Sequence, residues 1–246
     1  MQRFGLIGRP LSHSFSQRYF TEKFKREGLA DHRYDPFELD AVEELPLLLR
    51  DTPDLVGLNV TIPFKRSVIP LLDAVDPLAS AVGAVNTIAI RDGRTTGYNT
   101  DVEGFRSTLL PLLKGKKPRA IVLGSGGASR AVVCVLKELG IRFRVVSRSR
   151  ERGDLTWDLL DPIIVSVCPL IINTTPLGMF PDVEGRPELP YEAIGARHIL
   201  IDLVYNPEET AFLREGRLRG ANTTNGLHML EAQAEASWRI WQEQRQ

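Results

Sequence analysis

The chain is poor in cysteine and histidine, and neither residue type is grouped. Its 246 residues include two cysteines, Cys134 and Cys168, and each lies in an apolar stretch. Two buried free thiols are typical of a protein in a reducing compartment and are too few for a disulfide framework. The four histidines are scattered along the chain without the spacing of metal ligands. The sequence therefore predicts neither structural disulfides nor a metal centre.

The chain also has no excess of charge and no long apolar run. Lysine and arginine together number 31, as do aspartate and glutamate, so no net field attracts nucleic acid or an anionic membrane. The apolar run from Ile163 to Ile172 is short and broken by a proline, which excludes a membrane span. Arg3–Gly8 already reads as a strand and leaves no room for a signal peptide. We expect a cytoplasmic monomer or homodimer that acts on a small molecule.

A glycine-rich turn follows a short apolar run in the middle of the chain. Ala120–Leu123 reads as a buried parallel strand and Ala128–Gly140 as a helix. Between them lie Gly124, Gly126 and Gly127. Such a turn exposes backbone N–H groups and a positive helix end to a pyrophosphate. Ser129 stands where the dinucleotide fingerprint has its third glycine, so an ordinary tight strand-to-helix turn remains the alternative.

The end of the next predicted strand, Phe143–Val146, indicates which dinucleotide is bound. An acid about 20 residues beyond the glycines is typical of NAD sites, but here the chain reads Ser147-Arg148-Ser149-Arg150-Glu151-Arg152. Guanidinium groups pair phosphate oxygens in a bidentate manner, so these arginines favour NADP(H). A solvated basic turn is the alternative interpretation.

Apolar periodicity divides the remaining chain into two α/β parts. Strands are predicted at Arg3–Gly8, Arg33–Phe37, Leu55–Val60, Ile88–Ile90, Ala120–Leu123, Phe143–Val146, Leu170–Asn173, His198–Asp202 and Ala221–Thr224. Helices are predicted up to about Gly28, from an Asp40 cap through Leu49, after Pro77, at Val102–Leu113, at Ala128–Gly140, from about Glu208 to Gly216, and from about Gly226 onward. We expect an α/β protein with two domains, residues 1–100 with 226–246 and residues 101–225, the second Rossmann-like.

Four polar residues have both a structural and a functional interpretation. Ser14 or Ser16 could cap the first helix or hold a carboxylate beside its positive end. Pro63 predicts a new helix with Lys65 in its first turn, where a cation opposes the helix dipole. Asp101 is predicted in the first turn of the next long helix, where an acid is stabilising.

Seven short segments, taken together, resemble shikimate dehydrogenases over essentially the whole chain. These segments are Ser14–Ser16, Asn59–Lys65, Gly83–Thr87, Gly97–Asp101 with Gly104-Phe105, Gly124–Ala131, Asn173–Met179, and Asn225–Ala234. The resemblance implies an NADP(H)-dependent oxidoreductase that reversibly reduces 3-dehydroshikimate to shikimate, in the chorismate and aromatic amino-acid pathway. It also implies that Lys65 protonates the alkoxide formed by hydride transfer and that Asp101 orients this lysine.

The resemblance further implies two sets of binding residues. For the substrate, Ser14, Ser16 and Tyr205 would bind the carboxylate, and Asn59, Thr61, Asn86, Asp101 and Gln233 the hydroxyls. For NADP(H), Gly124, Gly126, Gly127 and Ala128 would hold the pyrophosphate, Arg148, Ser149 and Arg152 the 2′-phosphate, and Thr174, Gly226 and Met229 the ribose and nicotinamide.

The sequence departs from the family pattern at several places. Gln17 replaces a common proline, His228 a usual glycine, and Ser147 and Ser149 the commoner Asn and Thr. The alternatives are an NAD-dependent quinate/shikimate dehydrogenase, a methylenetetrahydrofolate dehydrogenase, which has little reason to keep two serines in its first loop, and an inactive dinucleotide-binding regulator. The presence of both Lys65 and Asp101 argues against the inactive regulator.

Overall fold

The computed structural model describes residues 1–11 and 15–243, and the chain forms two compact units. The first unit comprises the described residues of Met1–Thr100 and Ala234–Gln246, and the second comprises Asp101–Gln233. The boundary therefore falls between two residues of the last helix, α8 (Leu227–Glu243). Ser14 lies outside the described residues.

The first unit contains a mixed six-stranded sheet in the order β2-β1-β3-β5-β6-β4. The strands are β1 (Gln2–Gly8), β2 (His32–Glu38), β3 (Leu55–Val60), β4 (Ala74–Val75), β5 (Thr87–Arg91) and β6 (Arg94–Tyr98). β1 pairs in parallel with β2 and β3, whereas β5 pairs antiparallel with β3 and β6. Because β2 is an edge strand, Pro36 removes no hydrogen bond from the interior of the sheet.

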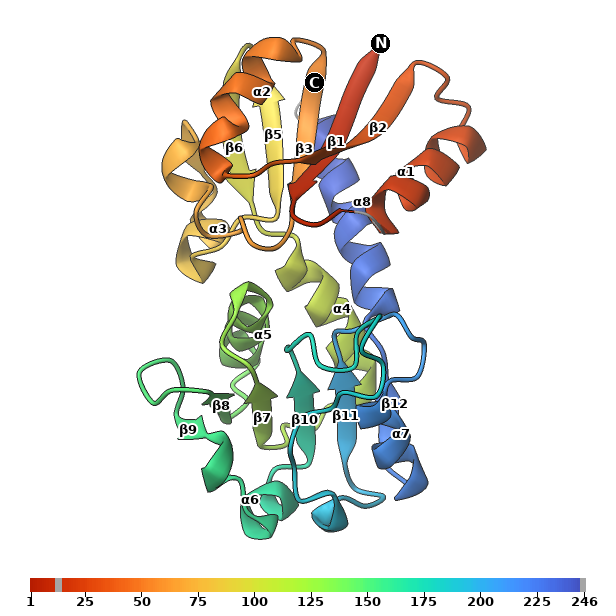
Figure 1. The fold of residues 1–246 in the computed structure, drawn as a ribbon. Coiled ribbons are helices and arrows are strands. Elements are labelled where there is room, and N and C mark those ends of the chain that lie inside the picture. The colour runs from red at the N-terminus through yellow and green to blue at the C-terminus, as the bar shows by residue number, and fades with distance from the viewer. Residues whose placement is uncertain (12–14, 244–246) are drawn as a thin grey trace. The chain divides into compact units, whose positions relative to one another are not determined.

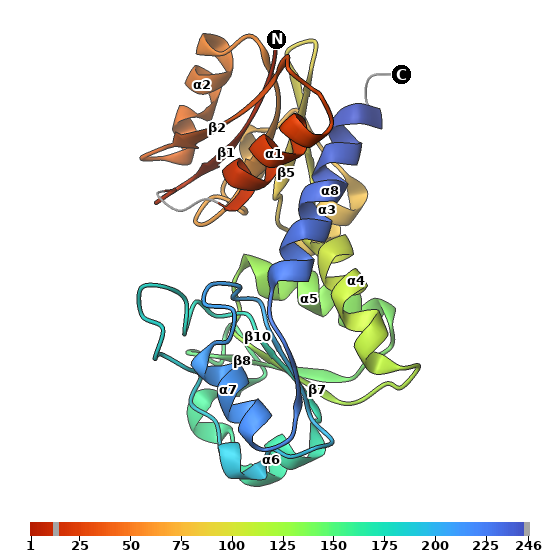
Figure 2. The ribbon, with the colours of Figure 1, turned by 90° about the vertical axis from the view of Figure 1, so that its right-hand side faces the viewer.

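Helices cover both faces of this sheet (Figures 1 and 2). One face packs on α1 (Phe15–Arg26) and on the part of α8 from Ala234, through a cluster that includes Phe4, Phe20 and Trp241. The other face packs on η1 (Val42–Glu44), α2 (Leu45–Asp51), η2 (Ile69–Leu71) and α3 (Pro77–Val82), through a second cluster around Leu58 and Ile88. Because side chains of successive strand residues point to opposite faces of the sheet, one strand contributes residues to both clusters.

The second unit contains a six-stranded sheet in which every pairing is parallel, in the order β12-β11-β10-β7-β8-β9. The strands are β7 (Ala120–Leu123), β8 (Phe143–Ser147), β9 (Leu155–Thr156), β10 (Leu170–Asn173), β11 (Ile199–Asp202) and β12 (Asn222–Thr224). The central strands are buried along their whole length, as expected for a parallel sheet covered on both faces.

Figure 2 shows α4 (Asp101–Leu113) and α5 (Gly127–Glu138) on one side of this sheet and α6 (Pro162–Val167) and α7 (Ala211–Leu218) on the other. The side of α6 and α7 also carries the short turns η3 (Trp157–Leu159) and η4 (Tyr191–Ala193). This architecture confirms the predicted α/β class with a Rossmann-like half.

Two predicted helix starts are wrong. Asp40 caps no helix, because η1 begins after Ala41, the Glu44 carboxylate accepts from the Ala41 N–H at 3.0 Å, and Asp40 pairs with Arg9. No α-helix follows Pro63 either, since the segment up to η2 forms only isolated turns. The Lys65 carbonyl accepts from the Val85 N–H at 2.7 Å, and this long-range bond replaces a helical one.

Smaller differences concern burial and short strands. Leu227, the first residue of α8, is exposed, and Cys134 is only half-buried, although both thiols are free as predicted. The two-residue strands β4 and β9 were not predicted, because they are too short for an alternating pattern to show. Within the described residues, no helix combines the length and apolarity that a membrane span requires, and no three metal-binding side chains are grouped.

Gly57, in β3, packs directly against Trp241 of α8, and this contact generates a stability prediction. A Cβ at residue 57 would lie 2.3 Å from Nε1 of Trp241, whose indole donates to the Ile88 carbonyl at 3.0 Å. Gly57→Ala should therefore lower the free energy of unfolding by about 1–3 kcal/mol, the usual cost of overpacking. The measurement is urea unfolding of the two proteins.

The matched control is Gly195→Ala, since a Cβ at residue 195 would meet no atom within 4 Å. Equal stability of the two variants would contradict the packing described here.

Candidate functional site

Asn59, at the end of β3, is the centre of a buried polar network in the first unit. Its Oδ1 accepts from the Tyr34 hydroxyl at 2.8 Å, and its Nδ2 donates to Ser237 at 2.9 Å. Weaker bonds of 3.3 Å run from the same Nδ2 to the Asn86 carbonyl and to Thr87. Because only 5% of Asn59 is exposed, these partners replace water for nearly all of its amide.

The Asn86 carbonyl fixes which way the Asn59 amide points. A carbonyl can only accept, so Nδ2 must face it and Oδ1 must face Tyr34. Tyr34 therefore donates to Asn59. Burial strongly raises the pKa of Tyr34, although a side-chain hydrogen bond with Ser16 acts in the opposite direction. The Tyr34 hydroxyl thus connects Ser16, in the first turn of α1, with Asn59.

Asn86 joins the same network from the segment before β5. Its Oδ1 accepts from the Thr100 N–H at 2.7 Å, and its Nδ2 donates to the Thr100 hydroxyl at 2.9 Å. The Thr87 hydroxyl lies 2.7 Å from that of Ser237, which completes the link to α8. The structure therefore brings together three predicted substrate residues, Ser16, Asn59 and Asn86.

Thr61 and Lys65 lie in the turns between β3 and η2. The Thr61 N–H donates to the Ile7 carbonyl at 2.9 Å, so this segment continues alongside the end of β1. The bond from the Val85 N–H to the Lys65 carbonyl places the main chain of Lys65 beside the segment that carries Asn86. Lys65 is half-buried, and Asp101, the first residue of α4 in the second unit, is buried.

In the second unit, the glycine turn lies at the carboxyl end of β7. Gly124 has a φ of +105°, and a Cβ there would lie 2.7 Å from Oγ1 of Thr174. Residue 124 therefore has to be glycine. The Thr174 hydroxyl and N–H both donate to the Leu123 carbonyl, at 2.7 and 2.9 Å. Thr174 and the glycine turn are thus neighbours, as a shared cofactor site requires.

The start of α5 fits an anionic group. Gly126 is the N-cap and has no side chain to satisfy the first N–H groups of the helix, and a Cβ at residue 126 would meet no atom within 4 Å. Gly127 and Ala128 then begin the helix with small side chains. Ser129, in place of a third glycine, lies in the helix and is buried. These residues suit the pyrophosphate of a dinucleotide.

The loop after β8 carries Arg148 and Arg152, and hydrogen bonds connect its two ends. The Ser147 hydroxyl donates to the Ser149 carbonyl at 2.8 Å and accepts from the Ser149 N–H at 3.1 Å. Asp154 closes the loop by accepting from the Val145 N–H at 2.8 Å. Arg148 and Arg152 are exposed, and neither forms an ion pair among the described residues. Both guanidinium groups are therefore available to a phosphate.

Three further predicted residues lie where the chain enters α8. A Cβ at Gly226 would lie 2.2 Å from the Leu203 carbonyl oxygen, so only glycine fits, and the Gly226 N–H donates to the Val204 carbonyl at 3.1 Å. Met229 is buried, and its carbonyl oxygen is 2.6 Å from where a Cβ of Gly104 would lie. The Gln233 amide donates to the Leu230 carbonyl at 2.9 Å. The remaining predicted substrate residue, Tyr205, follows β11 and is half-buried.

Sequence reasoning missed a buried carboxylate, Asp202, at the carboxyl end of β11. It is 0% exposed and pairs in register with Asn173 at the end of β10, whose Nδ2 donates to it at 2.9 Å. Burial raises the pKa of Asp202 to about 6. The available signal was the ending of two apolar strands, LIIN and ILID, each on one polar residue. Tyr34 and Ser237 were also missed, since neither belongs to a motif.

The all-parallel sheet, the uncapped glycine turn and the exposed arginines, together with a second α/β unit that holds a buried polar network, define a dinucleotide-dependent oxidoreductase. A family model described as "Shikimate dehydrogenase substrate binding domain" matches residues 6–88. A shikimate dehydrogenase (NADP(+)) of Halothermothrix orenii is 38% identical, covering 96% of this chain and 89% of that protein. The chain belongs to the shikimate dehydrogenase family.

Solved structures agree with this assignment. A shikimate 5-dehydrogenase from Thermus thermophilus, in complex with NADP(H) and shikimate, is 33% identical with a TM-score of 0.85 and covers 99% of this chain and 94% of that one. A quinate dehydrogenase from Corynebacterium glutamicum, in complex with NAD, is 27% identical with a TM-score of 0.88 and covers 98% and 94%. The fold is thus common to enzymes named for either substrate.

The buried Asp202 predicts a pH dependence of stability. Its pKa rises from 3.8 to about 6 on folding. A raised carboxyl pKa gives stability that is fully present below pH 4 and is lost as the pH rises through about 6, up to roughly 3 kcal/mol. The free energy of unfolding of wild type relative to Asp202→Asn should therefore fall between pH 4 and 7. Urea unfolding across this range measures it, and a constant difference would contradict the prediction.

Proposed function

We propose that the protein reversibly reduces 3-dehydroshikimate to shikimate with NADPH, a step of chorismate and aromatic amino-acid biosynthesis. The observation that carries the proposal is similarity over 96% of the chain to shikimate dehydrogenases (NADP(+)), at 36 and 38% identity, in a chain that contains Lys65 and Asp101. The two free thiols support a reducing compartment, and we place the enzyme in the cytoplasm.

The proposed acid and base is Lys65. When bound, NADPH supplies the hydride that reaches the ketone carbon. The ketone oxygen then becomes negatively charged, and the Lys65 ammonium stabilises and protonates it. Asp101 orients this ammonium and accepts from a substrate hydroxyl. In the direction of oxidation, the neutral amine of Lys65 takes the hydroxyl proton.

The proposed substrate residues divide by the group that they bind. Ser14, Ser16 and Tyr205 donate to the carboxylate, and Asn59, Thr61, Asn86, Asp101 and Gln233 contact the hydroxyls. Because both amide hydrogens of Asn59 already have protein partners, Asn59 can act on a hydroxyl only through its oxygen. The buried polar network around Asn59 supports the proposal, since it holds Ser16, Asn59 and Asn86 in place before any ligand binds.

The proposed cofactor residues follow the strand ends of the second unit. Gly124, Gly126, Gly127 and Ala128 hold the pyrophosphate, Arg148, Ser149 and Arg152 bind the 2′-phosphate, and Thr174, Gly226 and Met229 contact the ribose and nicotinamide. The uncapped start of α5 and the exposure of Arg148 and Arg152 support this arrangement.

A steady-state assay of Lys65→Ala tests the proposed function. Nicotinamide absorbance is followed with shikimate or quinate and with NADP or NAD. Wild type should prefer shikimate with NADP. The variant should lose about 10²- to 10⁴-fold in kcat, because general acid–base catalysis contributes that much, while its affinity for NADP is unchanged.

Arg66→Ala is the matched control, since it removes an exposed positive charge one residue away. A Lys65→Ala variant as active as this control would show that Lys65 is not the acid and base of the reaction. A wild-type protein that prefers quinate and NAD would instead favour the assignment as a quinate dehydrogenase.

Arg148→Ala and Arg152→Ala test the choice of dinucleotide. A charge-assisted hydrogen bond is worth about 1.5–3 kcal/mol, so each change should raise the KM for NADPH by roughly tenfold or more and leave the KM for NADH unchanged. Arg150→Ala, in the same exposed loop, removes an equal charge and should change either KM much less. Equal effects of all three variants would show that only the general charge of the loop matters.

A further inference from the structure

Asp202 belongs to none of the binding or catalytic sets above. We propose that it is a positioning residue, which holds the three loops of the second unit that carry Thr174, Tyr205 and Gly226. The inference rests on the proposed function, because these three residues are proposed to contact cofactor or substrate.

The first loop is held through Asn173. The Thr175 N–H and hydroxyl donate to Asn173 Oδ1 at 3.0 and 2.6 Å. A backbone N–H can only donate, so the Asn173 amide must direct Oδ1 toward Thr175 and Nδ2 toward Asp202. Thr174 therefore lies between two residues whose side chains are fixed by one carboxylate.

The second and third loops are held through the backbone. Oδ1 of Asp202 also accepts from the Val204 N–H at 3.0 Å, which fixes the residue before Tyr205. The Val204 carbonyl in turn accepts from the Gly226 N–H at 3.1 Å. A single carboxylate oxygen is thus one or two hydrogen bonds away from each of the three loops.

The other carboxylate oxygen connects these loops to α7. Oδ2 accepts from the Thr210 hydroxyl at 2.6 Å, and the same hydroxyl accepts from the Leu213 N–H at 3.3 Å as the N-cap of the helix. Asp202 therefore attaches the loops to the first turn of α7 as well as to the sheet.

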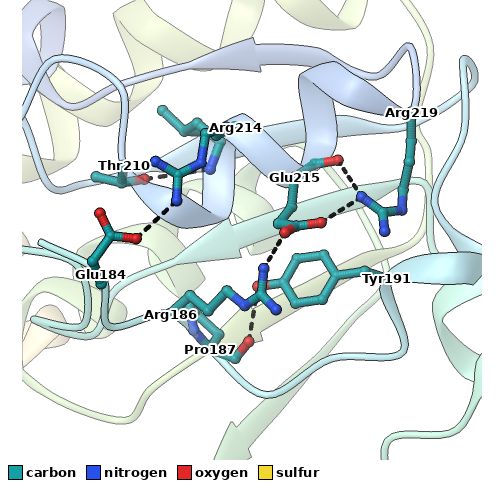
Figure 3. Close-up of polar contacts among 9 residues, drawn as sticks. Glu184, Arg186, Pro187, Tyr191, Thr210, Arg214, Glu215 and Arg219 are labelled. Atoms are coloured by element: carbon teal, nitrogen blue, oxygen red, sulfur yellow. Dashed lines mark hydrogen bonds and ion pairs between the residues drawn. The ribbon is translucent and has the colours of Figure 1, made fainter.

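Surface contacts attach the far end of the first loop to the same helix (Figure 3). Arg186 pairs with Glu215, Arg214 pairs with Glu184 at 2.9 Å, and the Arg186 guanidinium lies 4.9 Å from the centre of the Tyr191 ring. Exposed ion pairs of this kind contribute little stability, but together with Asp202 they fix both ends of the segment on α7.

The accepting oxygen should matter more than the charge. Donors from three segments converge on Asp202. An asparagine can still accept from Asn173 and Val204 through its one oxygen, but its amino group cannot accept the hydroxyl hydrogen of Thr210. An alanine leaves all three donors without an acceptor. Asparagine therefore removes the negative charge and one hydrogen bond, whereas alanine removes the charge and all three hydrogen bonds.

The test compares wild type with Asp202→Ala and Asp202→Asn. We expect Asp202→Ala to raise the Kd for NADPH, measured by fluorescence, and the KM for NADPH by about tenfold or more, since small displacements of positioned groups are costly. Asp202→Asn should remain within about twofold of wild type. Asp161→Ala is the control, because this variant removes the cap of α6, where Asp161 accepts from the Ile164 N–H at 2.7 Å, and should lower Tm without changing either constant.

An Asp202→Ala variant that only lowers Tm, as the control does, would overturn the inference. If it fails to fold, Thr175→Val takes its place, with an expected increase of about threefold in the Kd for NADPH for one lost bond and an unchanged Kd as the contrary result. Wild type that binds NADPH but does not reduce 3-dehydroshikimate would overturn the proposed function, while the Kd comparison would still decide on Asp202.

Discussion

Buried polar side chains at the ends of β-strands must find hydrogen-bond partners within the protein, and this constraint determines how the functional loops are arranged. Leaving one such group unpaired costs about 1–3 kcal/mol. In the first unit Asn59 meets the constraint at the end of β3, and in the second unit Asp202 meets it at the end of β11. Each gathers donors or acceptors from several segments, so each fixes the loops around it.

The two networks have different consequences for chemistry. The one around Asn59 uses neutral groups, and its Tyr34 and Ser237 connect β2 and α8 to the strand that leads to Lys65. The network around Asp202 contains a buried carboxylate with no cation among its described partners. Because burial raises the pKa of this group, its contribution to the free energy of unfolding depends on pH. In both, proposed ligand residues are held by side chains that are not themselves proposed to touch ligand. Preorganisation of this kind reduces the cost of ordering a site on binding.

The sequence predicted the repeating pattern better than it predicted single positions. Buried strands such as Ala120–Leu123 and the start of α5 followed from apolar runs and glycines, because those signals are local. The helix expected after Pro63 is absent, because the Val85 N–H bonds to the Lys65 carbonyl from 20 residues away in sequence (85 − 65). Asp202 and Tyr34 were missed for the same reason, since only their distant partners distinguish them from ordinary strand residues.

The most direct test of the account is a pair of crystal structures, one without ligands and one with NADP and shikimate. We expect the bonds of 2.8 Å between Tyr34 and Asn59 and of 2.9 Å between Asn173 and Asp202 to be present in both structures. Amides of Asn59 and Asn173 that turn away from these partners to contact the ligands would contradict it.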